Sequence, residues 1–204
     1  MPTAVDNATG RVRWKRFAAI MVPAAVAAGA LVFMTSEGAI AASFAVSGSS
    51  FKVSVDSLDG AGFEQFGAID KSADGKGHPV QVSAIGNATI RNLCQSMAVP
   101  TPLGTLSVVL HAGGPGGAPV QAKNLVMDVE SLAANAEFTN IQIGRDASTV
   151  NQVPGVTGAA GGFAQQATRV HLDHVRQTAW ATTAGTFKLN GLRMSLQPGS
   201  HDCF

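Results

Sequence analysis

Tyrosine is absent from this sequence, and charged residues are scarce. Only 13% of the 204 residues carry a charge, against about 25% in a typical soluble domain. The formal net charge is +1, so no strongly basic or acidic field is present to attract nucleic acid or another polyanion. Small residues are plentiful instead, with 23 glycines. This composition favours closely packed strands and turns over helices held by salt bridges, and the length suits one domain plus a targeting segment.

Several catalytic and cofactor-binding motifs are missing as well. The sequence contains no P-loop, no dinucleotide-binding fingerprint and no C-x-x-C pair. The segment LHAGGPGGAP at residues 110–119 is similar to the glycine-rich oxyanion-hole turn of some α/β-hydrolases, but their nucleophile motif G-x-S-x-G does not occur. Ser107 and His111 stand four residues apart on an extended segment, with no evident acid to orient the histidine. We therefore interpret the segment as a hairpin loop between residues 103–110 and 120–129.

The first 41 residues have the organisation of a targeting element. Basic residues at 11, 13, 15 and 16 precede an apolar run over residues 17–34, and Ala39 and Ala41 occupy the −3 and −1 positions of an A-x-A cleavage site. Two interpretations stay open: a signal peptide cleaved after Ala41, or an uncleaved hydrophobic helix that anchors the protein in the membrane. Because the basic flank comes first, residues 42–204 are expected to form an exported domain, secreted or held at the outer face of the cell membrane.

Only two cysteines are present, Cys94 and Cys203. Outside the cytoplasm they can oxidise to a disulfide, which would tie the C-terminal end of the chain to the middle of the domain. Two separate buried thiols are the alternative. A bridge that closes so long a loop would stabilise the fold by several kcal/mol in the chain-entropy account.

Hydrophobic residues beyond residue 45 recur mostly with a period of two, which is the period of a strand. They alternate with residues that are polar or charged, Val126 excepted, over residues 51–56, 125–130 and 170–173, a pattern typical of strands with one face turned inward. No long segment shows a persuasive amphipathic helical stripe, although a helical start over residues 162–175 stays open. The exported domain is therefore predicted to be all-β.

An internal repeat organises these strands. Residues 50–66 (SFKVSVDSLDGAGFEQF) align with residues 124–141 (NLVMDVESLAANAEFTNI), and shorter copies occur at residues 87–93 and 189–192. Each copy ends in two apolar residues three positions apart, and a flat strand sends such residues to opposite faces unless it bends or bulges. We predict kinked strand repeats that build a curved antiparallel sheet, a β-solenoid or a sandwich after the N-terminal hydrophobic helix. Chance similarity among strands rich in Gly, Ala and Val is the alternative.

The remaining polar residues form weak constellations. Asp56 and Glu130 hold matching repeat positions, which indicates a structural role more than a pair of catalytic carboxylates. A group of histidines and aspartates near the C-terminal end could hold a metal ion, but no ligand spacing supports it, so a solvated polar face is the interpretation. We predict no catalytic residue, no cofactor and no metal site. The members of the group considered are His171, Asp173, His174, His201 and Asp202.

Two stretches make the chain similar to a known family. The basic and apolar N-terminal segments followed by AIAASFAVSGSSFKV, together with FTNIQIGRDAS, resemble a family of exported actinobacterial proteins of unknown function over nearly the whole chain. Members sometimes carry the label cholesterol esterase, and their genes often lie beside that of a multi-span membrane protein. The resemblance implies a cell-envelope role and such a membrane protein as a partner. It supplies no catalytic residues.

Two functions are compatible with these features. The first is a non-catalytic cell-envelope protein whose apolar sheet face binds a lipid or a membrane partner. The second is an enzyme, a carboxylic ester hydrolase that acts on lipid or sterol esters. The missing motifs favour the first function. The expected partners are the membrane through the N-terminal segment, a lipid and a multi-span membrane protein, and nucleic acid is not expected.

Overall fold

The computed structural model describes residues 47–102 and 104–204, and this part of the chain consists of β-strands. Its one helix is a short 3-10 turn, η1 (Ala147–Thr149), so none of the described segments forms a helix long and apolar enough to cross a membrane. The all-β prediction is confirmed, whereas the predicted signal or anchor at residues 1–41 lies outside the described residues. The strands are β1 (Phe51–Lys71), β2 (Gly77–Arg91), β3 (Leu93–Thr101), β4 (Gly104–Ala112), β5 (Val120–Thr139), β6 (Gln142–Asp146), β7 (Phe163–Thr183), β8 (Thr186–Lys188) and β9 (Arg193–Pro198).

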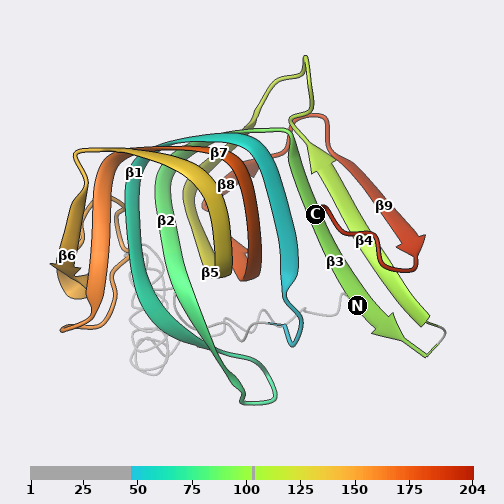
Figure 1. The fold of residues 1–204 in the computed structure, drawn as a ribbon, viewed down its shortest axis with the longest axis horizontal. Coiled ribbons are helices and arrows are strands. Elements are labelled where there is room, and N and C mark those ends of the chain that lie inside the picture. The colour runs from blue at the N-terminus through green and yellow to red at the C-terminus, as the bar shows by residue number, and fades with distance from the viewer. Residues whose placement is uncertain (1–46, 103) are drawn as a thin grey trace, which may run out of the picture. The chain divides into compact units, whose positions relative to one another are not determined.

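Four long strands pair in a closed cycle within one antiparallel sheet (Figure 1). β1 pairs with β2, β2 with β5 and β5 with β7, and β7 returns to β1. We call these four strands the ring. β3, β4 and β9 extend the sheet beyond β1, and we call them the wing. Of the three predicted architectures, the curved antiparallel sheet is the one present. A β-solenoid would stack its coils with parallel neighbours, whereas these strands are antiparallel. A sandwich would have two sheets, whereas these strands form one continuous sheet.

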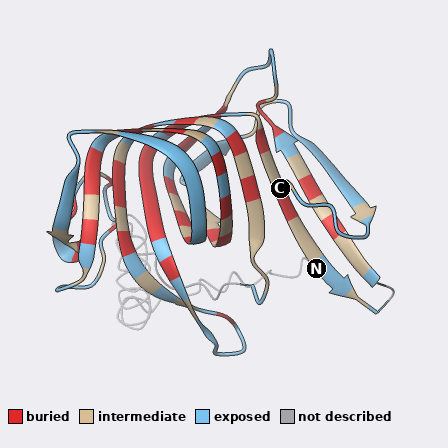
Figure 2. Cartoon of the chain, viewed as in Figure 1, coloured by how far each residue is buried: buried red, intermediate tan, exposed pale blue. Residues whose placement is uncertain are grey.

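The ring encloses the main hydrophobic core (Figure 2). Inward positions alternate along each strand with outward ones, as the period of two predicted. Each fully buried side chain of valine or leucine size stabilises the fold by about 1.5–3 kcal/mol, so this core is the principal source of stability. The buried members of the three predicted strands are Val53, Val55, Leu125, Met127, Val129, Val170 and Leu172.

A second, smaller core lies on the outer face of the ring. Residues 147–156 pack across the strands there and bury Phe66 among other apolar side chains. Beneath this loop Glu64 is fully buried, and its Oε1 accepts a hydrogen bond of 2.7 Å from the Val153 amide, while its Oε2 has no partner. Loss of solvent raises the pKa of Glu64, against the lowering effect of the Val153 and Gln152 amides. The loop is thus tied to β1 by a carboxyl group that is best buried when protonated.

The predicted kink holds at one repeat copy and is wrong at another. Asn92 has a φ of 52° between β2 and β3, and both Ile90 and Leu93 reach the ring core. Phe63 and Phe66, by contrast, belong to different cores, the first inside the ring and the second on its outer face. They lie on opposite faces of β1 as a flat strand requires, and both are buried because two cores exist.

In the other two copies the second apolar residue is not buried. Ile141 and Leu192 are 37% and 46% exposed, although Asn140 and Gly191 directly before them have positive φ angles. The long strands bend elsewhere: β1 at Gly62, whose φ is 70°, and β5 at register shifts between residues 128 and 135. The repeat therefore marks equivalent strands, but it does not place every bend.

Two local expectations fail. The helical start considered for residues 162–175 is absent, because this segment lies in β7 and is hydrogen-bonded to strands on both sides. Residues 113–119 do not form a hairpin loop. β4 pairs with β3 and β9, whereas β5 pairs with β2, β7 and β8, so the glycine-rich loop crosses between strands that are not neighbours.

The C-terminal tail covers one face of the wing. The Sγ atoms of Cys94 and Cys203 are 2.01 Å apart, which is disulfide distance. The Cys203 amide donates to Ser96 Oγ at 3.0 Å, and the His201 amide donates to Ser107 Oγ at 2.9 Å. The geometry agrees with the expected link between the end of the chain and the middle of the domain.

Candidate functional site

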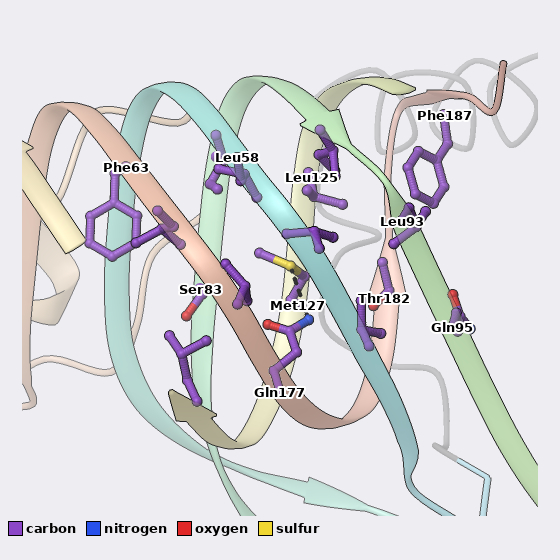
Figure 3. Close-up of a pocket in the computed structure, with 17 residues that line it drawn as sticks. Leu58, Phe63, Ser83, Leu93, Gln95, Leu125, Met127, Gln177, Thr182 and Phe187 are labelled. Atoms are coloured by element: carbon purple, nitrogen blue, oxygen red, sulfur yellow. Dashed lines mark hydrogen bonds between the residues drawn. The ribbon is translucent and has the colours of Figure 1, made fainter. Parts of the chain in front are cut away.

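An apolar crevice inside the ring is the candidate functional site (Figure 3). It holds about 670 Å³ of space that protein atoms do not fill, its open mouth included, and this space is narrow. Side chains from every ring strand, from β3 and from β8 line it, and none of these lining side chains is charged. Ligand sites in proteins are typically concave and mostly apolar, as this one is. The lining includes Leu58, Phe63, Ile85, Leu125, Met127 and Leu172.

Two buried polar side chains interrupt the apolar lining. Ser83 and Gln177 are 4% and 6% exposed, and both lie next to Met127. Ser83 Oγ accepts a hydrogen bond of 2.9 Å from Gln65 Nε2, and Gln177 Nε2 donates to Met127 Sδ at 3.6 Å. Gln177 Oε1 has no partner among the described residues. We call Ser83 and Gln177 the polar spot of the crevice.

The apolar lining continues from the crevice onto the wing. Gln95 of β3 lines the crevice and lies opposite Val53 of β1, while Leu110 of β4 lies opposite Gln95 and Met194 of β9 lies opposite Leu110. Residues directly opposite in neighbouring strands share a sheet face. On this face Met194 and Leu196 are 65% and 64% exposed. The tail bonds to the other face of the wing, so the apolar face carries none of these tail contacts.

The glycine-rich loop does not assemble a hydrolase site. Ser107 is buried, and its Oγ donates to the Gly199 carbonyl at 2.8 Å while it accepts from the His201 amide. His111 lies further along the same strand, where its Nε2 is 4.0 Å from Cys94 Sγ. Four residues of extended strand separate Ser107 and His111 by about 13 Å, which is beyond the reach of a proton transfer. The hydroxyl of Ser107 holds the C-terminal tail.

His171 and Asp173 lie side by side on the outer face, as the strand pattern predicted, and Asp59 joins them from β1. His171 Nδ1 is 2.7 Å from Asp59 Oδ1, and His171 Nε2 is 3.1 Å from Asp173 Oδ2. The hydrogen bond to Asp59, followed by that to Asp173, raises the pKa of His171. His201 lies apart from them, bonded to the Pro198 carbonyl. Across residues 47–102 and 104–204 no three His, Cys, Asp or Glu side chains are placed to hold a metal ion.

An acidic pair on the outer face was not singled out from the sequence. Asp70 of β1 and Asp128 of β5 bring their carboxyl groups within hydrogen-bonding reach, so that they can share a proton. Burial, and then the charge of Asp70, raises the pKa of Asp128 to about 7. Burial also raises the pKa of Asp70, against the lowering effect of Asp128 and His78. His78 lies opposite Asp70 on β2 and stacks on Trp180 with 3.8 Å between ring centroids.

We expect Asp128→Asn to stabilise the protein above neutral pH and to have little effect in mild acid. Because the pKa of Asp128 is raised from 3.8 to about 7 on folding, the stability that protonation supplies is full below the unfolded pKa and is lost as pH rises through about 7. Asparagine can still donate to Asp70 and cannot ionise. Thermal melts of the full chain across this range measure the effect, and each kcal/mol regained corresponds to about 2–4 °C in Tm. A variant whose Tm differs from the wild type by the same amount at every pH would contradict the shared proton.

Sequence reasoning missed both residues of the polar spot. A signal for Gln177 was available, because it stands two residues after the inward-facing Val175 and so falls on an inward position of the same strand. No comparable signal existed for Asp70 and Asp128, since their meeting depends on how β1, β2 and β5 associate. The same holds for Asp59 beside His171.

Comparisons with curated proteins and with solved structures give no match. A family model does match, and it spans residues 47–204, the same range over which the structure describes the β domain. This agrees with the resemblance to proteins of unknown function that the sequence itself shows. The chain belongs to DUF6230, a family of unknown function.

Proposed function

We propose that the protein is an exported, non-catalytic cell-envelope protein that binds a lipid by holding its hydrocarbon chain in the crevice of the ring. The observation that carries this proposal is a narrow crevice lined by side chains of which none is charged. Each methylene group that leaves water for such a lining contributes about 0.8 kcal/mol, so a chain of moderate length binds without any ionic contact.

The wing supplies a route for the lipid. Its apolar face is continuous with the crevice, and the side chains of Met194 and Leu196 on its outermost strand are largely exposed. Leu132 and Phe187, which line the crevice, are 43% and 37% exposed and so stand at its open side. Exposed apolar side chains gathered on one face are typical of surfaces that meet a lipid or a partner protein. A hydrocarbon chain can therefore pass from a lipid surface over the wing into the crevice past Gln95, which is polar but uncharged.

Export is supported by two independent features. The basic and apolar N-terminal segments have the order of a signal peptide or membrane anchor. Cys94 and Cys203 lie at disulfide distance, and such pairs form and persist mainly in oxidising compartments outside the cytoplasm. A cleaved signal peptide would release the domain outside the cell membrane, and an uncleaved anchor would hold it at the outer face of that membrane. Lipids are available to the domain in both cases.

Native mass spectrometry of the full chain tests the proposal. The protein is exported from a bacterial host, purified in a mild detergent and compared before and after extensive detergent exchange. We expect an added mass of lipid size in the first sample and its loss, together with a lower Tm, in the second. Samples of identical mass and Tm that also fail to bind added hexadecanol or hexadecanoate would refute lipid binding.

A substitution at the mouth links binding to the crevice. Thr182→Trp should fill the opening and reduce lipid occupancy at least fivefold, because Thr182 lines the crevice opposite Met127 and is only partly buried. Thr178→Trp is the matched control, since Thr178 lies on the same strand with similar burial and is not part of the lining. Equal occupancy in both variants would place the lipid elsewhere. If Thr182→Trp does not fold, Leu132→Trp at the same mouth makes the same test.

A further inference from the structure

We infer that the ligand of the crevice is an uncharged single-chain lipid whose one hydrogen-bonding head group is recognised by Gln177. This inference rests on the proposed lipid-binding function and adds to it the class of lipid and the residue that selects it. The evidence is the state of the Gln177 amide, the lack of charge around it and the narrowness of the space.

The Gln177 amide is buried in apolar surroundings and is poorly satisfied by the protein. Its side chain is 6% exposed, and its Nε2 has a single hydrogen-bond partner among the described residues, the sulfur of Met127 at 3.6 Å. A thioether is a weak acceptor, and Gln177 Oε1 has no partner in this part of the chain. Buried polar groups in proteins are nearly always hydrogen-bonded, and one left unpaired costs about 1–3 kcal/mol.

The free oxygen of this amide faces the crevice and not the packed protein. Gln177 belongs to the lining, and Figure 3 shows its amide among Met127 and Ser83. Its Oε1 lacks a partner without being sealed from the empty space, in contrast to Glu64 Oε2, which is both unpartnered and fully enclosed. A hydroxyl group of a ligand in the crevice can donate to Oε1, and a hydroxyl or carbonyl oxygen can accept from Nε2.

The surroundings exclude a charged head group. The crevice lining contains no Lys, Arg or His to neutralise a carboxylate or phosphate and no Asp or Glu to neutralise an amine. Burying an unpaired charge in such a site costs far more than one hydrogen bond returns. A neutral hydroxyl or carbonyl, in contrast, satisfies Gln177 without that cost.

The narrow shape selects one hydrocarbon chain. The lining side chains approach from all four ring strands and leave a thin space through a ring closed by hydrogen bonds between strands. Because this closed ladder resists widening, a single extended chain fits more readily than two chains or a bulky ring system. The ligand class that meets all three conditions is a long-chain alcohol or a similarly neutral single-chain lipid.

Photo-crosslinking with matched probes tests this inference on the purified full chain. Three probes carry the same hexadecyl chain and mid-chain diazirine and end in a hydroxyl, a carboxylate or a methyl group. Apparent dissociation constants come from crosslinking yields, and peptide mass spectrometry locates the labelled residues. We expect the alcohol to bind about fivefold more tightly than the alkane, as one neutral hydrogen bond provides, and more tightly than the carboxylate at pH 8.

Gln177→Leu supplies the decisive comparison. The near-isosteric leucine should remove the preference for the alcohol over the alkane while it leaves alkane binding intact or improved. Gln95→Leu is the control, because Gln95 lines the same crevice but is only partly buried, and it should keep the preference. If Gln177→Leu does not fold, Gln177→Met, which also lacks the amide, replaces it.

The possible results separate the two proposals. Equal binding of all three probes in the wild type, tighter binding of the carboxylate, or loss of the preference in Gln95→Leu alone would overturn the role of Gln177 and leave lipid binding standing. Absence of crosslinks by every probe to the crevice-lining peptides would overturn lipid binding itself.

Discussion

Gly62→Ala should lower the free energy of unfolding by about 2–5 kcal/mol, because two costs add at this position. Gly62 has a φ of 70°, a conformation that costs an L-residue roughly 1–2 kcal/mol. A Cβ atom there would also lie 2.6 Å from the carbonyl oxygen of Gln152, a contact that only movement of the backbone can relieve. Overpacking of this kind adds about 1–3 kcal/mol.

Gly67→Ala is the control for this substitution. Gly67 lies in the same strand, its φ is not positive, and a Cβ atom built there meets nothing within 4 Å. Alanine at this position should be neutral or slightly stabilising, since it restricts the unfolded chain. Urea unfolding of the full-length Gly62→Ala and Gly67→Ala variants gives their free energies of unfolding. Similar values for the two would show that the backbone at Gly62 is not constrained by the loop above it.

Gly62→Ala should also displace the loop at residues 147–156, which packs on the outer face of the ring. Gln152, which the new methyl group would displace, lies next to Val153, whose amide is bonded to the buried Glu64. A shift of this loop would expose Glu64 to water and so remove the burial that raises its pKa. We therefore expect hydrogen exchange of the Val153 amide to increase in Gly62→Ala even under conditions where the ring stays folded.

Local order in this protein was predictable from the sequence because it depends on neighbouring residues alone. Alternation over residues 125–130 identified a strand and told which of its side chains face inward, and Met127 and Val129 are buried accordingly. Asn92 has a positive φ at the place where the spacing of Ile90 and Leu93 required a bend. These inferences need no knowledge of partner strands.

The pairing of distant strands could not be predicted from the sequence, and neither could any feature that depends on this pairing. Closure of the ring joins β7 to β1 across more than a hundred residues, and no residue type marks such a junction. The outer core is likewise invisible until residues 147–156 are seen to pack against Phe66. The kink predicted at Phe66 is wrong for this reason: the prediction assumed a single hydrophobic core, whereas β1 contributes side chains to two.

The candidate site was likewise predictable in its local features but not in those that depend on strand pairing. The shortage of charge in the composition already favoured an apolar face, and the lining of the crevice carries no charged side chain. The position of that face inside a closed ring, and the juxtaposition of Gln177 with Ser83 and Met127, come from three strands that the sequence could not align. A polar residue at an inward position of a strand is the one local mark that such a site leaves.

The largest loss of stability is expected when the link between Cys94 and Cys203 is removed. The two residues are 109 positions apart, and closing a loop of this length reduces the entropy of the unfolded chain by the equivalent of about 4.7 kcal/mol in the loop-closure model. At about 2–4 °C for each kcal/mol, Cys203→Ala should lower Tm by roughly 9–19 °C. Differential scanning calorimetry of the full chain, purified with the pair oxidised, measures the change.

Reduction distinguishes the effect of the covalent link on stability from the effect of the cysteine side chain itself. Dithiothreitol should destabilise the wild type by nearly as much as Cys203→Ala does, and it should have no effect on the double variant with alanine at both positions. Only noncovalent contacts then hold the tail, among them the hydrogen bonds to Ser96 and Ser107 and the ion pair between Lys52 and Asp202, and such contacts contribute only about 0.5–1.5 kcal/mol each. Because β3 carries both Cys94 and the crevice-lining Gln95, release of the tail also removes one constraint from the strand that joins the wing to the ring, which then depends on its pairing with β1 and β4. A wild type indifferent to reductant would mean that the two thiols are not joined in the native protein, and that noncovalent contacts fasten the tail.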